Sequence, residues 1–172
     1  MFTAEERREY IGGSDIAAVM GMNRWKTSLT LWLEKIGEID LNDNSNNEAK
    51  ELGRELEDFV AKKFSKKTGL KVRKRQEKYT HKKYPFLVAH VDRIIVGTDE
   101  LLECKTCSSY KKDEWGGEEI PQEYILQVIW YLGITGRKRG HIAVLIGGQS
   151  FKTRVVAVSY THLRAHETTL HL

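Results

Sequence analysis

Apolar residues recur every three or four positions in two long stretches of the chain, and this spacing predicts two amphipathic helices. The first is expected from about Glu48 to Thr68, where Gly69 ends it. The second is expected to begin at Pro121 and to run to about Ile134. The apolar stripe of the first helix consists of Leu52, Leu56, Phe59, Val60 and Phe64.

Two short helices are expected earlier in the chain, over residues 16–20 and 29–36. A side chain suited to an N-cap precedes each apolar run, and a glycine follows it. The capping candidates are Ser14 and Asp15 for the first run and Thr27 or Ser28 for the second. The polar stretch 42–47 is rich in Asn, Asp and Ser and is expected to be a loop.

The strands follow a different pattern. A basic, alternating stretch at 72–80 predicts an edge strand, and two β-rich runs within 90–105 flank a Gly-Thr-Asp-Glu turn, which indicates a hairpin. Residues 140–146 and 151–157 are expected to be closing strands. Helices, then strands, then a helix and further strands indicate an α+β (α/β) fold around one mixed sheet flanked by helices.

The hairpin carries the residues with the most specific chemistry. Asp92 and Glu103 are equidistant from the turn centre, so a two-residue turn would place them opposite each other and a four-residue turn would make them diagonal neighbours. Either way the carboxylates come within about 5–8 Å, close enough to share a divalent cation. Lys105 is expected on the same face, with Cys104 behind it. Two carboxylates and a lysine suit metal-assisted phosphodiester hydrolysis, although an ordinary solvated strand pair remains the alternative.

Three further positions could complete such a site. Glu57 lies at the edge of its helix's apolar stripe, where a carboxylate needs a metal or a basic partner unless its head reaches water. Gln127 has the same position on the later helix and could donate to a phosphate or satisfy buried polar atoms. Arg7 precedes Ser14 by seven residues, at a helix start that could bind an anion or simply be capped.

Composition sets the wider limits. A chain of 172 residues suits one domain, and a net charge of +4 is compatible with a polyanionic partner. No run approaches the roughly 20 apolar residues of a membrane span, and no signal-peptide pattern begins the chain, which favours the cytoplasm. Cys104 and Cys107 are expected to be reduced and without a metal role, since no second cysteine pair exists.

Basic and aromatic residues leave further alternatives open. The lysines and arginines between residues 71 and 83 could contact a nucleic-acid backbone or simply solvate an edge strand. Most of the tryptophans, Trp25, Trp32, Trp115 and Trp130, are expected in the core. Trp115 lies in a Gly-rich polar loop and is the tryptophan considered for stacking on a base.

The final stretch, residues 158–172, differs from the rest and holds three of the six histidines. It resembles translated sequencing-adaptor read-through, so we expect a non-native tail that takes no part in the fold. The domain is therefore expected over residues 1–157, with the natural protein continuing beyond that point.

Five short segments occur in an order that resembles the YqaJ-type viral recombinase family, relatives of lambda exonuclease in the PD-(D/E)xK nuclease superfamily. Together they cover roughly residues 7 to 157, and Val91 replaces the proline of the motif name. The resemblance implies a restriction-endonuclease-like core. It also implies a 5′-to-3′ exonuclease that degrades one strand of duplex DNA and leaves a 3′ overhang for an annealing protein. The segments are Arg7 with residues 11–17, residues 52–57, Asp92, residues 102–105 and residues 124–128.

The resemblance also implies roles for individual residues. Asp92 and Glu103 would bind Mg²⁺, which Mn²⁺ could replace, with the backbone carbonyl of Cys104 as a further ligand. Lys105 would orient or activate the water, and Glu57 would help to hold metal or water. The 5′-phosphate and DNA contacts would come from Arg7, Ser14 and Gln127, and from His90, which departs from the pattern because lambda exonuclease has a serine there, near the phosphate.

The implied setting is a bacterial host cell, with a phage or prophage origin and a single-strand annealing recombinase as partner. A homotrimer is possible by the same resemblance, and no membrane association is expected. The alternatives are another PD-(D/E)xK endonuclease or repair nuclease, and a DNA-binding module without catalysis.

Overall fold

The computed structural model describes residues 4–39, 47–75 and 77–157. The expected non-native tail and nearly all of the predicted loop at 42–47 lie outside these residues. The helices, with η for short 3-10 turns, are α1 (Ala4–Arg8), η1 (Gly13–Asp15), α2 (Ile16–Val19), α3 (Ser28–Lys35), α4 (Asn47–Thr68), η3 (Ser109–Lys111), η4 (Asp113–Trp115) and α5 (Gln122–Thr135). The strands are β1 (Val72–Lys74), β2 (Lys78–Thr80), β3 (Val88–His90), β4 (Arg93–Ile95), β5 (Glu100–Cys107), β6 (Arg139–Ile146) and β7 (Ser150–Ala157).

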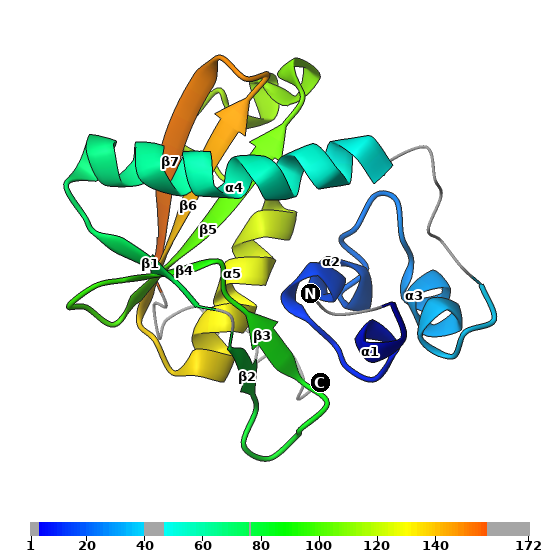
Figure 1. Cartoon of the computed structure of the whole chain (residues 1–172). Coiled ribbons are helices and arrows are strands. Elements are labelled where there is room, and N and C mark those ends of the chain that lie inside the picture. The colour runs from blue at the N-terminus through cyan, green and yellow to red at the C-terminus, as the bar shows by residue number, and fades with distance from the viewer. Residues whose placement is uncertain (1–3, 40–46, 76, 158–172) are drawn as a thin grey trace, which may run out of the picture.

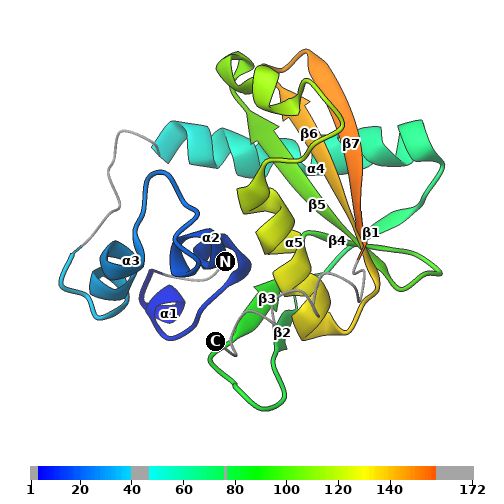
Figure 2. The same cartoon turned by 180° about the vertical axis from the view of Figure 1, so that it is seen from behind.

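The central sheet has the strand order β1-β4-β5-β6-β7. β5 and β6 are parallel and the other neighbours are antiparallel, so the sheet is mixed, as predicted. A parallel pair needs a crossover connection, which contains α5. Figures 1 and 2 show α4 across one face of the sheet and α5 across the other, which confirms the predicted arrangement of helices around a mixed sheet.

Each face of the sheet has its own apolar core because alternate residues of a strand point to opposite sides. On the α4 face, Val60 and Phe64 pack with Leu102. On the α5 face, Leu101 packs with Val128. The predicted stripe of α4 is only partly buried: Leu52 and Phe59 are 49% and 51% exposed. In Figure 1 the N-terminal end of α4 extends past the sheet.

The prediction of one edge strand over residues 72–80 is wrong. β1 pairs with β4 in the central sheet, whereas β2 pairs with β3 in a separate two-stranded sheet. The partner strand is interrupted at the same level, between His90 and Arg93. The two paired segments, 72–80 and 88–95, are therefore both broken at the same level, and each break separates the central sheet from the two-stranded sheet. Asp92 lies at the break in the second segment.

The N-terminal helices α1, α2 and α3 group together beside α5 in both views (Figures 1 and 2). The stretch before η1 joins the rest of the fold through Ile11, whose backbone pairs with the segment around Leu87. At Gly13 the backbone of η1 packs closely against α5, where there is no room for a side chain. A Cβ atom there would lie 2.4 Å from Cε1 of Tyr131 and 3.1 Å from Cγ of Gln127.

Two of the four tryptophans lie where they are expected and two do not. Trp115 is completely buried and stacks on Tyr124 with ring centroids 5.5 Å apart, which confirms its place in the core and excludes the alternative role in base stacking. Trp25 and Trp32 were expected in the core, but they are 86% and 55% exposed. Trp130 packs against the core on the α5 face, as expected.

Two other expectations concern the thiols and the membrane. Cys104 and Cys107 are both free, and Cys104 is buried on the α4 face, behind the carboxylates. Among the residues that the structure describes, no helix is both long enough and apolar enough to cross a membrane.

Candidate functional site

The hairpin of β4 and β5 brings the two predicted carboxylates together. Arg93 pairs with Leu102 and Ile94 with Leu101, and one further step in this register sets Asp92 beside Glu103. The connection is four residues long, with Gly97 at a φ of 82°, yet its symmetry leaves the two acidic residues opposite rather than diagonal. The backbone N–H of Cys104 donates a 2.8 Å hydrogen bond to Oδ2 of Asp92, which fixes that carboxylate against β5.

Glu103 lies on the α5 face of the sheet and is only 2% exposed. Its Oε1 atom accepts a 2.7 Å hydrogen bond from Nε2 of Gln127 and lies 2.7 Å from Nζ of Lys105. Its Oε2 atom is buried and has no hydrogen-bond partner among the described residues. A buried carboxylate oxygen without a partner is costly, so this atom is a ready position for a cation or its water ligands.

Asp92 is close enough to Glu103 for their charges to interact. Burial raises the pKa of Asp92 well above its usual value, and the charge of Glu103 raises it further. The ammonium of Lys105 and the N–H of Cys104 oppose these effects without cancelling them. Two carboxylates that repel each other in a buried site favour the binding of a divalent cation between them.

Lys105 lies on the same face of β5 as Glu103, as its spacing predicts. Burial by itself lowers the pKa of this ammonium, but the charges of Glu103 and Asp92 outweigh it, and the net pKa is raised. Nζ also lies 5.5 Å from the ring centroid of Tyr124, a cation–π distance. Lys105 is therefore held as a cation beside the carboxylates.

The donor set suits Mg²⁺ better than a transition metal. The carboxylate oxygens of Asp92 and Glu103 are the available ligands, and hard oxygens with several retained waters are what Mg²⁺ prefers. Within residues 4–39, 47–75 and 77–157, no group of three or more His, Cys, Asp or Glu side chains could hold a metal. A metal here would depend on water and substrate oxygens to complete its ligand shell.

Glu57 has a basic partner that the sequence pattern did not identify. Arg93 is 3% exposed, and its guanidinium hydrogen-bonds to Glu57, to Asp58 and, at 2.6 Å, to the backbone carbonyl of Asp92. Burial lowers the pKa of Arg93, but the hydrogen bond and charge of Glu57 outweigh this, and the net pKa is raised. A charged residue on the core side of an otherwise apolar strand was the available signal, because it requires an acidic partner.

Gln127 lies inside the carboxylate cluster. Its Nε2 atom donates to Glu103 and to the hydroxyl of Tyr131, both at 2.7 Å. Both amide N–H groups are therefore used within the protein, which fits the alternative that Gln127 satisfies buried polar atoms. Tyr131 is also buried, and its pKa is raised well above the usual value by burial and by the charges of Glu103 and Asp92.

The remaining predicted residues lie in or beside a second group, which residues 7–15 form. Arg7 and Ser14 are exposed, on α1 and η1. The ring of His90 lies 5.3 Å from that of Tyr10, and burial lowers the pKa of His90, as do the charges of Lys78 and Arg7.

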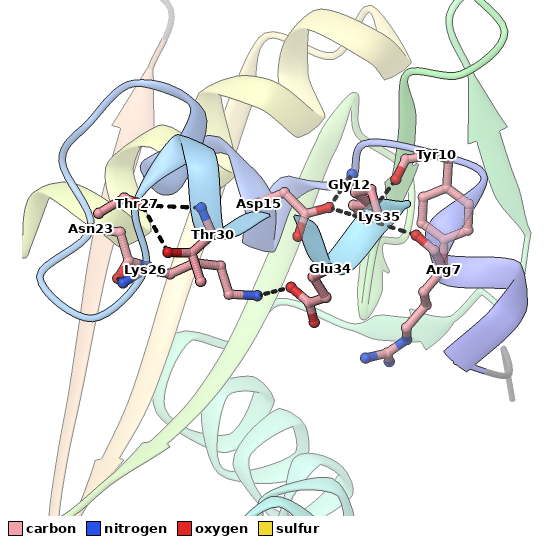
Figure 3. A network of polar contacts seen from close by, with 10 residues as sticks. All are labelled: Arg7, Tyr10, Gly12, Asp15, Asn23, Lys26, Thr27, Thr30, Glu34 and Lys35. Carbon is pink, nitrogen blue, oxygen red and sulfur yellow. Dashed lines mark hydrogen bonds and ion pairs between the residues drawn. The ribbon is translucent and has the colours of Figure 1, made fainter. Parts of the chain in front are cut away.

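Lys35 holds this second group in place. It donates to the backbone carbonyls of Arg7 and Tyr10, both at 2.7 Å, and pairs with Asp15 at 2.9 Å. Asp15 also accepts a 3.0 Å bond from the N–H of Gly12. Figure 3 shows these contacts and shows the Arg7 side chain extending away from them.

Comparison with known proteins gives a family-level result. The YqaJ-like viral recombinase domain matches residues 4–138. An uncharacterized protein YqaJ of Bacillus subtilis (strain 168) is 48% identical over 148 residues, which is 85% of this chain and 46% of that protein. The chain therefore spans about half the length of this curated relative.

Solved structures share the fold. The alkaline exonuclease LHK-Exo of Laribacter hongkongensis matches with a TM-score of 0.69 and 19% identity over 94% of this chain and 84% of its own. Its structure in complex with dAMP gives a TM-score of 0.70 with 20% identity, over 95% and 85% of the two chains. A phage related exonuclease of Haemophilus somnus 129PT matches with 0.64 and 13% identity over 92% and 88%. At these identities the likeness concerns the fold.

Proposed function

Since this chain belongs to the YqaJ-like viral recombinase domain family, we propose that it is a Mg²⁺-dependent nuclease that cuts one strand of duplex DNA from a 5′ end. The product would carry a 3′ overhang, the substrate of a single-strand annealing protein. The observation that carries the proposal is the pair of partly buried Asp92 and buried Glu103, in which Oε2 of Glu103 has no hydrogen-bond partner among the described residues.

Asp92, Glu103 and the carbonyl of Cys104 would hold the metal. Bound there, Mg²⁺ would neutralise charge on the scissile phosphate and lower the pKa of the attacking water, and Mn²⁺ could replace it. The site is anionic without a cation, because two carboxylates face one ammonium at its centre. It would therefore repel a phosphate until a cation is bound.

Lys105 would act directly on the water or the phosphate. Its pKa is raised, so it is a hydrogen-bond donor rather than a general base at neutral pH. Its contact with Glu103 fixes the direction in which the ammonium points. We assign Lys105 the role of orienting the nucleophile and stabilising negative charge on the phosphate.

Glu57 would act from the neighbouring helix α4. It pairs with Arg93, and Arg93 in turn contacts the backbone of Asp92. We propose that Glu57 holds metal-bound water rather than the metal itself. Arg93 would keep the carboxylates of α4 and the backbone of the hairpin in register.

The 5′-phosphate would bind at the N-terminal group. Arg7 and Ser14 are exposed and available to a phosphate, and His90 lies near enough for the charge of Arg7 to lower its pKa. A terminal phosphate held there would set the distance from the strand end to the cut. Gln127 has two proposed roles, binding the 5′-phosphate and satisfying buried polar atoms. The phosphate role is the less direct one, because the amide N–H groups of Gln127 already donate to Glu103 and Tyr131.

The wider assignments follow from the family. We propose duplex DNA ends as substrate, an annealing recombinase as partner and the cytoplasm of a bacterial host, for a protein of phage or prophage origin. The structure of LHK-Exo with dAMP supports a nucleotide ligand. We also propose that three copies of the protein form a homotrimer.

Cleavage of linear duplex, compared with closed-circular duplex that has no ends, distinguishes an exonuclease from an endonuclease and from a DNA-binding module. Linear duplex should be degraded in the presence of Mg²⁺, while closed-circular duplex of the same sequence should persist. Equal cleavage of both forms would identify an endonuclease. Salt-sensitive binding of both forms without any cleavage in Mg²⁺ or Mn²⁺ would identify a DNA-binding module.

A further inference from the structure

A cavity of about 360 Å³ lies between the loop that follows α2 and the loop that precedes α5. This volume is in the range of small-molecule sites. Apolar and aromatic side chains from both loops line it, and charged side chains surround them. The apolar and aromatic lining consists of Met22, Trp25, Ile120 and Pro121.

Trp25 lines the cavity and is 86% exposed, although hydrogen bonds hold the backbone of its turn. Oδ1 of Asn23 accepts hydrogen bonds from the N–H groups of Trp25 at 2.8 Å and Lys26 at 2.9 Å. Figure 3 shows Asn23 at this turn. An aromatic side chain on a fixed turn loses little conformational entropy when a ligand stacks on it.

The contacts around this turn extend to α3. Lys26 pairs with Glu34, and the hydroxyl of Thr27 caps the helix by accepting a 3.0 Å bond from the N–H of Thr30, contacts that Figure 3 draws as dashed lines. The turn that carries Trp25 is therefore anchored on both sides, by its own Asx contact and by the start of α3.

The charges at the cavity favour a base over a phosphate. Arg24 pairs with Glu114 at 3.5 Å, and Lys111 pairs with Glu123 at 3.8 Å. With both cations paired, and Glu119 added to the lining, the cavity has no excess positive charge to attract an anion. A neutral aromatic ring with donors and acceptors on its edge fits this lining.

Helix α5 connects the cavity to the carboxylate cluster. Glu123 lines the cavity, and the next residue, Tyr124, has its ring 5.5 Å from Nζ of Lys105. Lys105 contacts Glu103 directly. On the basis of the nuclease function proposed above, we infer that the cavity beside Trp25 binds a nucleobase of the strand being cut, with the indole as its stacking surface.

Binding can be tested without cleavage. In a Trp32→Phe variant, Trp25 is the one remaining exposed tryptophan within the described ranges, because Trp115 and Trp130 pack into the core. In EDTA, dAMP should quench its fluorescence in a saturable way, whereas 2-deoxyribose 5-phosphate should not. Adding Trp25→Phe should remove the quenching. Equal effects of the two probes, or quenching that survives Trp25→Phe, would overturn the inference.

Kinetics provide the second measurement. Loss of one stacked base corresponds to about a 5- to 150-fold change, so Trp25→Ala should lower kcat/KM on linear duplex within that range, and Trp25→Phe should recover most of it. Trp32→Ala, an exposed tryptophan that does not line the cavity, should have no effect. If wild type cleaves and Trp25→Ala cleaves equally well, the nucleobase site is wrong and the nuclease function stands. If wild type does not cleave, the nuclease function fails, and the quenching experiment alone decides the cavity.

Discussion

Glu103 combines the structural and chemical demands on this site in one side chain. Removing a carboxylate from water costs several kcal/mol unless its partners replace the lost hydration. Lys105 and Gln127 both contact Oε1, whereas Oε2 is buried and has no hydrogen-bond partner among the residues that the structure describes. Such uneven satisfaction is typical of a ligand site rather than of a structural ion pair.

Replacing Gln127 separates its two possible roles. Gln127→Ala removes the donor to Glu103 and to Tyr131 and leaves buried acceptors unsatisfied. The free energy of unfolding, measured in urea, should fall by about 1–3 kcal/mol. Gln122→Ala, exposed at the start of the same helix, is the control and should change stability little. Unchanged stability together with a lost preference for 5′-phosphorylated ends would instead assign Gln127 to the substrate.

At this scale the sequence predicts what depends on local geometry. Period-2 alternation was sufficient to put Glu103 and Lys105 on one face with Cys104 behind them. The symmetric turn brings Asp92 close to Glu103, but the diagonal arrangement expected for a four-residue turn is wrong. Arg93 was missed because its acidic partners lie 35 and 36 residues earlier, on α4. No local pattern specifies which face of that helix meets the hairpin.

At the scale of elements, the site lies where secondary structure is interrupted. β5 is a central strand of the sheet, which fixes Glu103 between the strands β4 and β6. β3 and β4 are separated by Val91 and Asp92, so the backbone of Asp92 is outside the ladder. The side chain of Asp92 can therefore turn toward the N–H of Cys104.

Substitutions on the two sides of the contact between η1 and α5 test directly how the N-terminal segment is positioned. Gly13→Ala would force a methyl group against the ring of Tyr131, and the fold should lose about 1–3 kcal/mol, measured by thermal or urea unfolding. Gly133→Ala, on α5 with open space around the new Cβ, should instead gain up to about 1 kcal/mol from helix propensity. Equal effects of the two substitutions would contradict the close packing of η1 on α5.

Long-range packing also explains the elements that the sequence did not predict. Trp115 lies in a polar, Gly-rich stretch, yet it is buried because Tyr124 stacks on it and Lys152 of β7 hydrogen-bonds to its carbonyl. The long helices α4 and α5 and the closing strands β6 and β7 begin and end within one or two residues of their predicted bounds, because their sequence patterns are long and regular. The split of 72–80 into β1 and β2 depends on the partner strands and has no local signal.

The whole molecule joins two groups of polar residues through α5. Gln127 and Tyr131 of this helix contact the carboxylate cluster on one side and Gly13 of the N-terminal segment on the other. The exposed Arg7 and Ser14 belong to that N-terminal segment. Under the proposed function, this connection would couple the recognition of a strand end to the position of the cut.

End recognition should depend on Arg7 and Ser14. Each substitution, Arg7→Ala or Ser14→Ala, should reduce the preference for 5′-phosphorylated over 5′-hydroxyl duplex by about 10- to 100-fold, the usual effect of losing a hydrogen bond to a charged group. The measurement is the ratio of kcat/KM on the two substrates. Lys138→Ala, beside the hairpin turn, removes the charge of a basic side chain elsewhere and should leave the ratio unchanged. An unaltered ratio in both test variants would refute the phosphate site.

The most direct test of the central claim is nucleotide release from linear, 5′-phosphorylated duplex, measured for wild type and for Asp92→Asn and Glu103→Gln at matched folded fraction. We predict release by wild type that requires Mg²⁺ or Mn²⁺ and stops in EDTA, and a loss of at least about 10²- to 10⁴-fold in each variant. Circular dichroism should show that both variants remain folded. Release that continues in EDTA, or that persists at the wild-type rate in either variant, would contradict a metal site formed by these two carboxylates.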